Sequence, residues 1–179
     1  MKLKKSILLG TGAAVAVLAL TPLASGHATV SLLQPQGKAL TSARVAMLLR
    51  VPNEKAAQNT FDVIMSVPEA VQRTISVKRN TDYTIVLTKV DTGQKTAEGT
   101  PIMATTKVRW IAKPDTQIKP GFYDEFYFRV QNPATAQKMC FPVDQWYTKK
   151  DASSKAEAVH WTGDATSATP ASCVDVVAS

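Results

Sequence analysis

After residue 26, the apolar residues of the chain recur mostly at every second position, and this period constrains the fold more than any other feature. Neighbouring side chains on a strand point to opposite faces of a sheet, so a period of two predicts half-buried strands. A period of 3.6, which would predict a long amphipathic helix, is not sustained there. The alternating runs are 45–49, 61–65, 84–90, 108–111 and 126–130.

Short turn signals separate these runs. Several short strands at such spacing predict an all-β fold, an antiparallel β-sandwich forming a single domain. The period alone leaves the choice between a cupredoxin-like and an immunoglobulin-like strand order open. The polar segment 148–158 is expected to form a long hairpin loop. The turn signals are Pro52-Asn53, Pro68-Glu69, Arg79-Asn80, Thr92-Gly93, Pro120-Gly121 and Asn132-Pro133.

Residues 1–26 have the composition of a cleavable signal peptide. A lysine-bearing start is followed by an apolar stretch over 7–20 and then by small residues. The apolar stretch is shorter than the ~20 residues that span a bilayer. We therefore expect an exported, periplasmic or secreted protein whose working domain is 27–179, without stable insertion into the membrane.

The cleavage position decides which residue becomes the new N-terminus. Small side chains at Ala24 and Gly26 favour cleavage after Gly26, which leaves His27 first. A rival cut after Ala28 would remove His27. Cleavage after Gly26 leaves 18 basic residues against 14 acidic ones, a net charge of +4. This mild excess, without a cluster of basic and aromatic residues, gives no support for nucleic-acid binding.

The chain has two cysteines, Cys140 and Cys173. An even number of cysteines in an exported chain predicts a disulfide, which here would tie the C-terminal tail to an internal strand. The alternative is a pair of thiolate ligands for copper or zinc. It has less support, because there is no third cysteine and the spacing is not that of a zinc motif.

Residues for catalysis are scarce, and we expect no enzymatic activity. The whole chain contains only two histidines, His27 and His160, and shows no nucleophile elbow, phosphate-binding loop or dinucleotide fingerprint. The adjacent carboxylates of Asp124 and Glu125 point to opposite faces of a strand, so they are poorly placed to act together.

His27 at a new N-terminus would offer two nitrogen donors to one metal ion. The α-amine and the imidazole Nδ1 close a chelate ring, and nitrogen donors of this kind suit Cu(II). Both donors must be free of protons to bind, so affinity for copper should rise with pH. The alternative is that cleavage merely exposes a surface histidine.

From His27 onward, the chain resembles the YcnI-like copper-binding family of exported bacterial β-sandwich proteins. Five short segments, in the family's order, carry the resemblance. They are His-Ala-Thr-Val-Ser at 27–31, Arg-Val-Pro-Asn-Glu at 50–54, Val-Arg-Trp at 108–110, Pro-Gly-Phe-Tyr-Asp-Glu-Phe at 120–126 with Phe128, and Phe-Pro-Val at 141–143 with Gln145, Tyr147 and Trp161.

The resemblance implies a site for one Cu(II) ion, a mono-histidine brace. His27 would chelate the copper, Glu125 would supply a carboxylate, and the indole of Trp161 would cover the metal. The implied role is copper acquisition, delivery or homeostasis, with hand-over to a copper-handling membrane or periplasmic protein.

The period of two partly agrees with this site. Glu125 shares its parity with Tyr123 and Tyr127 and should face away from the core. Asp124 falls on the core parity, which the pattern does not explain without a bulge or an edge position. Trp110 and Trp146 are expected to pack in the core or on a sheet face. The residues predicted to face the core are Phe122, Phe126, Phe128 and Val130.

Two other functions compete with copper handling. A copper-dependent oxidase or monooxygenase with a two-histidine brace would need His160 at the metal. His160 and Trp161 are neighbours on a predicted strand and point oppositely, so both cannot face the copper. The other alternative is an extracytoplasmic interaction domain that binds no metal. In addition, the long loop before Trp161 departs from the family's short turn, so the register that places Trp161 is less constrained.

Overall fold

The structure, a computed structural model, describes residues 26–33 and 38–179. The predicted signal peptide, apart from Gly26, lies outside this part. No helix among the described residues is long and apolar enough to cross a membrane. The strands of the described part are β1 (Thr29–Leu32), β2 (Ala39–Leu40), β3 (Arg44–Pro52), β4 (Thr60–Ser66), β5 (Ser76–Val77), β6 (Tyr83–Lys95), β7 (Pro101–Ala112), β8 (Tyr123–Gln131), β9 (Gln137–Phe141), β10 (Val143–Tyr147), β11 (Glu157–Trp161) and β12 (Ser172–Val177), with one 3₁₀ turn, η1 (Glu69–Val71).

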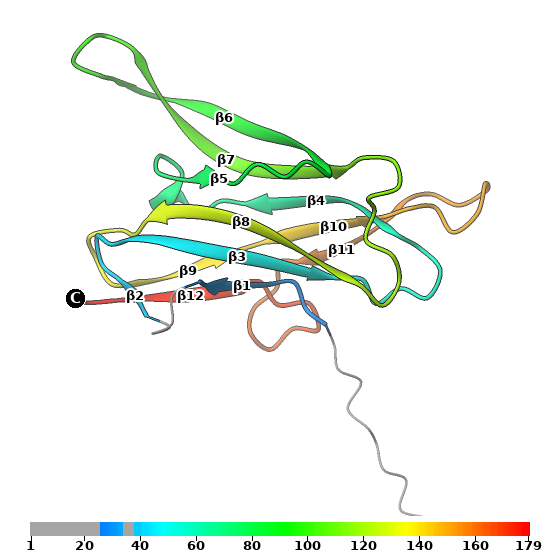
Figure 1. The fold of residues 1–179 in the computed structure, drawn as a ribbon. Coiled ribbons are helices and arrows are strands. Elements are labelled where there is room, and N and C mark those ends of the chain that lie inside the picture. Colours follow the sequence, from blue (N-terminus) through cyan, green and yellow to red (C-terminus); the bar gives the residue numbers. More distant parts are fainter. Residues whose placement is uncertain (1–25, 34–37) are drawn as a thin grey trace, which may run out of the picture.

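These strands form a β-sandwich (Figure 1), as predicted. One sheet has the order β1-β3-β8-β5 and the other has the order β11-β10-β4-β7-β6. A smaller sheet, β2-β12-β9, completes the fold, and its β12–β2 pair is parallel. The strand pairs of the two large sheets are all antiparallel.

The core lies between the sheets and is built largely from alternate residues of β3, β4, β8 and β10. Removing this apolar surface from water stabilises the fold by ~25 cal/mol per Å². At its centre the ring of Phe126 lies 4.8 Å from that of Trp110 and 4.9 Å from that of Tyr83, between centroids. Trp146, in contrast, is half-buried. The prediction of core positions is confirmed for Phe126, Phe128 and Val130, which are at most 1% exposed.

The prediction of a core position is wrong for Phe122, which is 66% exposed. It precedes β8, whose strand geometry starts only at Tyr123, so the period of two does not extend to it. Its carbonyl instead accepts a hydrogen bond from the backbone N–H of Asn53, over 2.8 Å. This bond fixes the backbone of the turn, with the phenyl ring outside.

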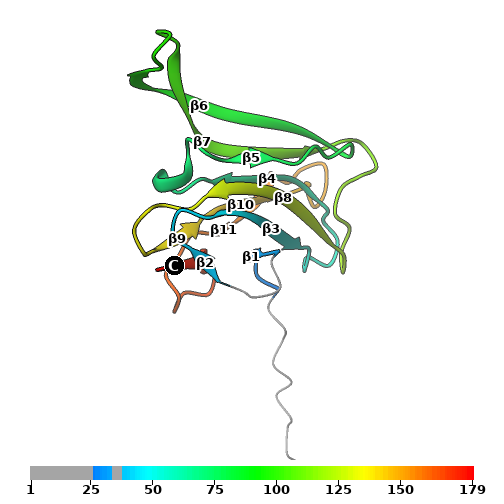
Figure 2. The ribbon, with the colours of Figure 1, turned by 60° about the vertical axis from the view of Figure 1, so that its left-hand side comes forward.

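The turn predicted at Thr92-Gly93 is also wrong, because β6 continues to Lys95. The register of β6 against β7 shifts between Asp91 and Lys95, and Gly93 has a φ of 72°. The glycine therefore marks a bulge in the strand, where positive φ is readily adopted. The hairpin turns after β6, and it projects beyond the sandwich (Figure 2).

Asp124, whose core parity the sequence pattern left unexplained, lies beside a buried hydroxyl. The Tyr83 hydroxyl donates a hydrogen bond to Asp124 Oδ2 over 2.6 Å. Asp124 itself is half-buried. A carboxylate at the margin of the core is thus paired without any bulge in β8 at this point.

The predicted hairpin loop and disulfide are both present. Strands β10 and β11 pair across the long loop. Cys140 of β9 and Cys173 of β12 are bonded and lie opposite each other in the register. Strand β12 is in turn linked to β1, since the backbone N–H of Val30 donates to Ser172 Oγ over 2.7 Å. The disulfide therefore holds a strand that supports the segment next to His27.

Removing this disulfide should destabilise the domain. Closure of a loop across 33 residues is worth about 3–4 kcal/mol, chiefly through the unfolded chain. We expect a Cys140→Ser/Cys173→Ser variant to lose about that much in urea unfolding monitored by circular dichroism. An unchanged midpoint would show that the disulfide does not constrain folding.

Stability should also fall at alkaline pH because of two buried tyrosines. Burial raises the pKa of Tyr147 to about 12, and burial with the Asp124 hydrogen bond raises that of Tyr83. The two tyrosines contribute fully to the free energy of unfolding below the ordinary tyrosine pKa of about 10. Above that pH the contribution is lost, because only the tyrosines of the unfolded chain then ionise. Urea unfolding of the wild type and of Tyr83→Phe between about pH 9 and 12 checks this. The variant should lose less stability over that range, and equal losses would contradict the assignment.

Candidate metal centre

His27 and Trp161, two of the predicted site residues, lie together. Their ring centroids are 5.2 Å apart, and the ring planes meet at 48°. His27 comes just before β1, at the edge of one sheet, and Trp161 ends β11, at the edge of the other. His27 is half-buried, whereas Trp161 is only 6% exposed. The indole is therefore a fixed part of the sandwich, and the imidazole lies against it.

A buried amide fixes the indole. Trp161 Nε1 donates to Gln145 Oε1 over 3.0 Å. Gln145 Nε2 donates to the carbonyl of Pro52 over 2.7 Å and to Thr60 Oγ1 over 2.8 Å. Gln145 is 0% exposed, and these partners occupy both ends of its amide. Gln145 thus joins Trp161 to the end of β3. The residue that carries the next carboxylate of the site follows this strand.

That carboxylate belongs to Glu54, which the sequence analysis did not select. The backbone N–H of Gly26, one residue before His27, donates to Glu54 Oε1. Glu54 is exposed, while its neighbour Asn53 is 1% exposed. The segment 50–54 was identified as a family motif, and Glu54 is the only acidic residue in it. That was the available signal.

Asn53 holds the backbone that carries Glu54. Its Nδ2 donates to the carbonyls of Gln58 and Ile118, each over 2.7 Å. Its Oδ1 accepts from the backbone N–H of Lys55 over 3.0 Å. A fully bonded, buried side chain next to Glu54 restricts the positions that this carboxylate can reach.

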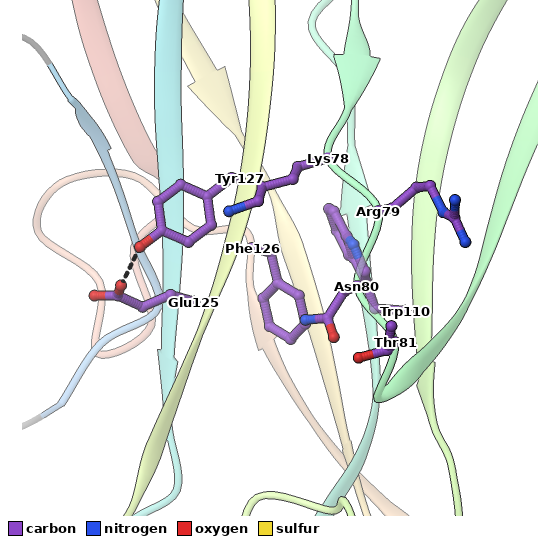
Figure 3. Close-up of a pocket in the computed structure, with 8 residues that line it drawn as sticks. All are labelled: Lys78, Arg79, Asn80, Thr81, Trp110, Glu125, Phe126 and Tyr127. Atoms are coloured by element: carbon purple, nitrogen blue, oxygen red, sulfur yellow. Dashed lines mark hydrogen bonds between the residues drawn. The ribbon is translucent and has the colours of Figure 1, made fainter.

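Glu125, the predicted carboxylate ligand, has other partners. Arg50 donates to its Oε1 through Nη2 over 2.7 Å and through Nε over 3.1 Å, and the Tyr127 hydroxyl donates to its Oε2 over 2.7 Å. Figure 3 shows this last bond at a pocket that Lys78 also lines. The Tyr127 hydroxyl and the Arg50 guanidinium hold the pKa of the Glu125 carboxyl below its usual range. Its outward direction is as predicted, and its role as a ligand stays a prediction.

His160 lies away from the indole, as the alternation predicts. It is exposed where Trp161 is buried, and its Nδ1 lies 2.6 Å from Asp144 Oδ1. Within the described residues, no three His, Cys, Asp or Glu side chains gather closely enough to hold a metal ion. A metal centre at His27 would therefore need a donor that is not a side chain, and the α-amine of a cleaved chain is such a donor.

The Gln145 bridge should be a measurable coupling. In Gln145→Leu the Trp161 N–H and the Pro52 carbonyl lose a buried partner, which costs about 1–3 kcal/mol. We expect a smaller loss of stability when Gln145→Leu is made in a Trp161→Phe background. The Trp161 N–H, one of the two groups left without a partner, is then absent. Urea unfolding of the four proteins in this double-mutant cycle measures the difference. Additive losses would contradict the bridge.

Solved structures support the sandwich architecture. An uncharacterised protein from Nocardia farcinica, described as having an immunoglobulin-like fold, is similar over 86% of this chain and 99% of its own, with a TM-score of 0.61 and 18% identity. A putative membrane-anchored protein from Corynebacterium diphtheriae matches over 86% of this chain and 35% of its own, with a TM-score of 0.47 and 10% identity. The first likeness shows an immunoglobulin-like fold, and the second is too remote to add to it.

Sequence comparison identifies the family without naming a ligand. No curated protein matches the chain. Residues 27–176 match the family described as a domain of unknown function, DUF1775, which is the YcnI-like domain family. The match starts at His27 and covers all the segments that carried the resemblance. The chain therefore belongs to the DUF1775 family.

Proposed function

We propose that the protein is an exported Cu(II)-binding protein that carries one copper ion at the N-terminus of its mature chain. Its role would be copper acquisition, delivery or homeostasis. One observation carries the proposal: the His27 ring lies against Trp161 while the backbone nitrogen just before His27 is bonded to Glu54. The imidazole thus lies beside a buried indole, and the main-chain nitrogen of the preceding residue is bonded to a carboxylate.

Cleavage after Gly26 would turn the backbone nitrogen of His27 into the α-amine of a chelate. In the uncleaved chain, the neighbouring Gly26 nitrogen is the group that contacts Glu54. We therefore propose Glu54, rather than Glu125, as the carboxylate nearest the copper. Glu125 already accepts three hydrogen bonds from Arg50 and Tyr127, and a metal ion would have to displace some of them.

The surroundings favour a copper ion that is bound and handed on over one that activates oxygen. The face of the Trp161 indole attracts a cation and keeps water from one side of the site. Glu54 is exposed, so copper could enter and leave without opening the sandwich. The second histidine, which an oxygen-activating brace would use, faces away from the indole and lies against Asp144.

The test is a Cu(II) titration of untagged, exported protein whose first residue has been identified by intact mass. We expect one copper per chain with submicromolar affinity and nitrogen coupling in the electron paramagnetic resonance spectrum. His27→Ala should abolish this binding. Glu54→Gln should weaken it by about tenfold or more, as loss of a ligand or its support does, and Glu125→Gln should change it little. Trp161→Phe should alter the spectrum while one copper still binds.

The matched control is a chain that begins at Thr21, in which His27 is internal and has no α-amine. It should fold equally well and lose the high-affinity copper. Equal affinity in this longer chain would contradict the chelate. A larger effect of Glu125→Gln than of Glu54→Gln would restore Glu125 as the ligand. Sustained hydrogen peroxide release by the copper-loaded protein with ascorbate would favour an oxidase instead.

A further inference from the structure

Three connections meet at one end of the sandwich, which we call the loop end: residues 53–59, 113–122 and 148–156 (Figure 1). Hydrogen bonds join them. The backbone N–H of Thr148 donates to the carbonyl of Asn59 over 2.8 Å, and Asn59 Nδ2 donates to Gln117 Oε1 over 3.1 Å. The loop end is therefore one connected surface, although its parts are far apart in the sequence.

An aromatic tip stands out at this surface. Phe122, in the loop end, and the adjoining Tyr123 are 66% and 60% exposed, more than any other large apolar residue of the described chain. Two backbone hydrogen bonds to Asn53 hold the tip. The Asn53 N–H donates to the Phe122 carbonyl, and the Asn53 carbonyl accepts from the Gly121 N–H. Gly121 has a φ of 79°, which suits the tight turn. The exposure of Phe122 is thus built into the backbone.

The loop end carries an excess of positive charge. The loop end contains six lysines against three acidic residues, Glu54, Asp115 and Asp151. Since residues 27–179 carry a net charge of +4, most of that excess lies on this surface. In the described part of the chain only Lys55 among the six has an ion-pair partner, Glu157. The six are Lys55, Lys113, Lys119, Lys149, Lys150 and Lys155.

We propose that the loop end docks peripherally on an anionic lipid surface, with Phe122 entering the headgroup region and the lysines attracted to the lipid charge. Aromatic side chains favour the membrane interface, and each lysine near an anionic bilayer adds to its attraction. The composition favours lipid over a protein partner. Lysine is depleted in protein–protein interfaces, whereas a charged bilayer requires only a density of positive charge and no fixed partner for each one.

Docking in this way would bring Glu54 to the membrane surface. Glu54 and the aromatic tip line the same shallow groove, together with Pro120. Lipid binding does not itself depend on copper, so it stands apart from the proposed function. If both hold, the copper ion would be presented to acceptors embedded in the membrane.

The experiment is co-sedimentation of the mature protein, without added copper, with vesicles of phosphatidylglycerol and phosphatidylcholine. We expect binding that rises with the fraction of phosphatidylglycerol, falls at high salt, and is absent on pure phosphatidylcholine. Phe122→Ser should lower the partition coefficient about tenfold, through lost apolar burial. Lys149→Glu/Lys150→Glu should lower it by more than tenfold, since about fivefold is expected for each positive charge removed.

Matched controls come from the projecting β6–β7 hairpin, which has exposed apolar residues and lysines of its own. Val90→Ser and Lys89→Glu should leave vesicle binding nearly unchanged, and Phe122→Ser should leave copper affinity unchanged. Equal binding to neutral and anionic vesicles would overturn the proposal. So would equal losses for Val90→Ser and Phe122→Ser. Binding to poly-L-glutamate but not to phosphatidylglycerol vesicles would point instead to an acidic protein and would also overturn it.

Discussion

The amide of Gln145 is the interaction on which the arrangement of the candidate centre depends. It lies wholly buried between the sheets, where an unsatisfied polar group would be costly, and it is bonded to Trp161, Pro52 and Thr60. Because these three partners come from β11, β3 and β4, one side chain sets the distance between the indole and the end of β3. Apolar packing alone would leave that spacing less specific, since it has no direction.

Asn53 has a corresponding role on the other side. Its side chain closes the loop after β3, and its main chain holds the turn that carries Phe122. The same residue therefore fixes the backbone next to Glu54 and the backbone of the aromatic tip. Two buried amides, Gln145 and Asn53, thus convert a generic sandwich edge into a surface with defined side-chain positions.

The sequence predicted the parts of the structure that depend on local pattern. Alternation gave the strands and most of the core, and the cysteine count gave the disulfide. It failed where the pattern continues beyond the strand, at Phe122, and where a glycine serves a bulge, at Gly93. It also missed Glu54, because its contact with Gly26 spans 28 residues and depends on how β1 pairs with β3. Period and spacing report which face a residue takes, but they do not report its partner across the fold.

The position of His27 gives a physical reason for linking copper binding to export. In the uncleaved chain the nitrogen of His27 belongs to a peptide bond, which is planar and has no free lone pair to donate. The neighbouring Gly26 N–H meets Glu54 as a neutral hydrogen-bond donor. Cleavage after Gly26 would remove that donor and create a basic amine one residue further on. Under the proposed function, the folded scaffold of Trp161, Gln145 and Glu54 exists before the chelate does. Processing then supplies the last donor, so the protein would acquire its copper only after it has left the cytoplasm.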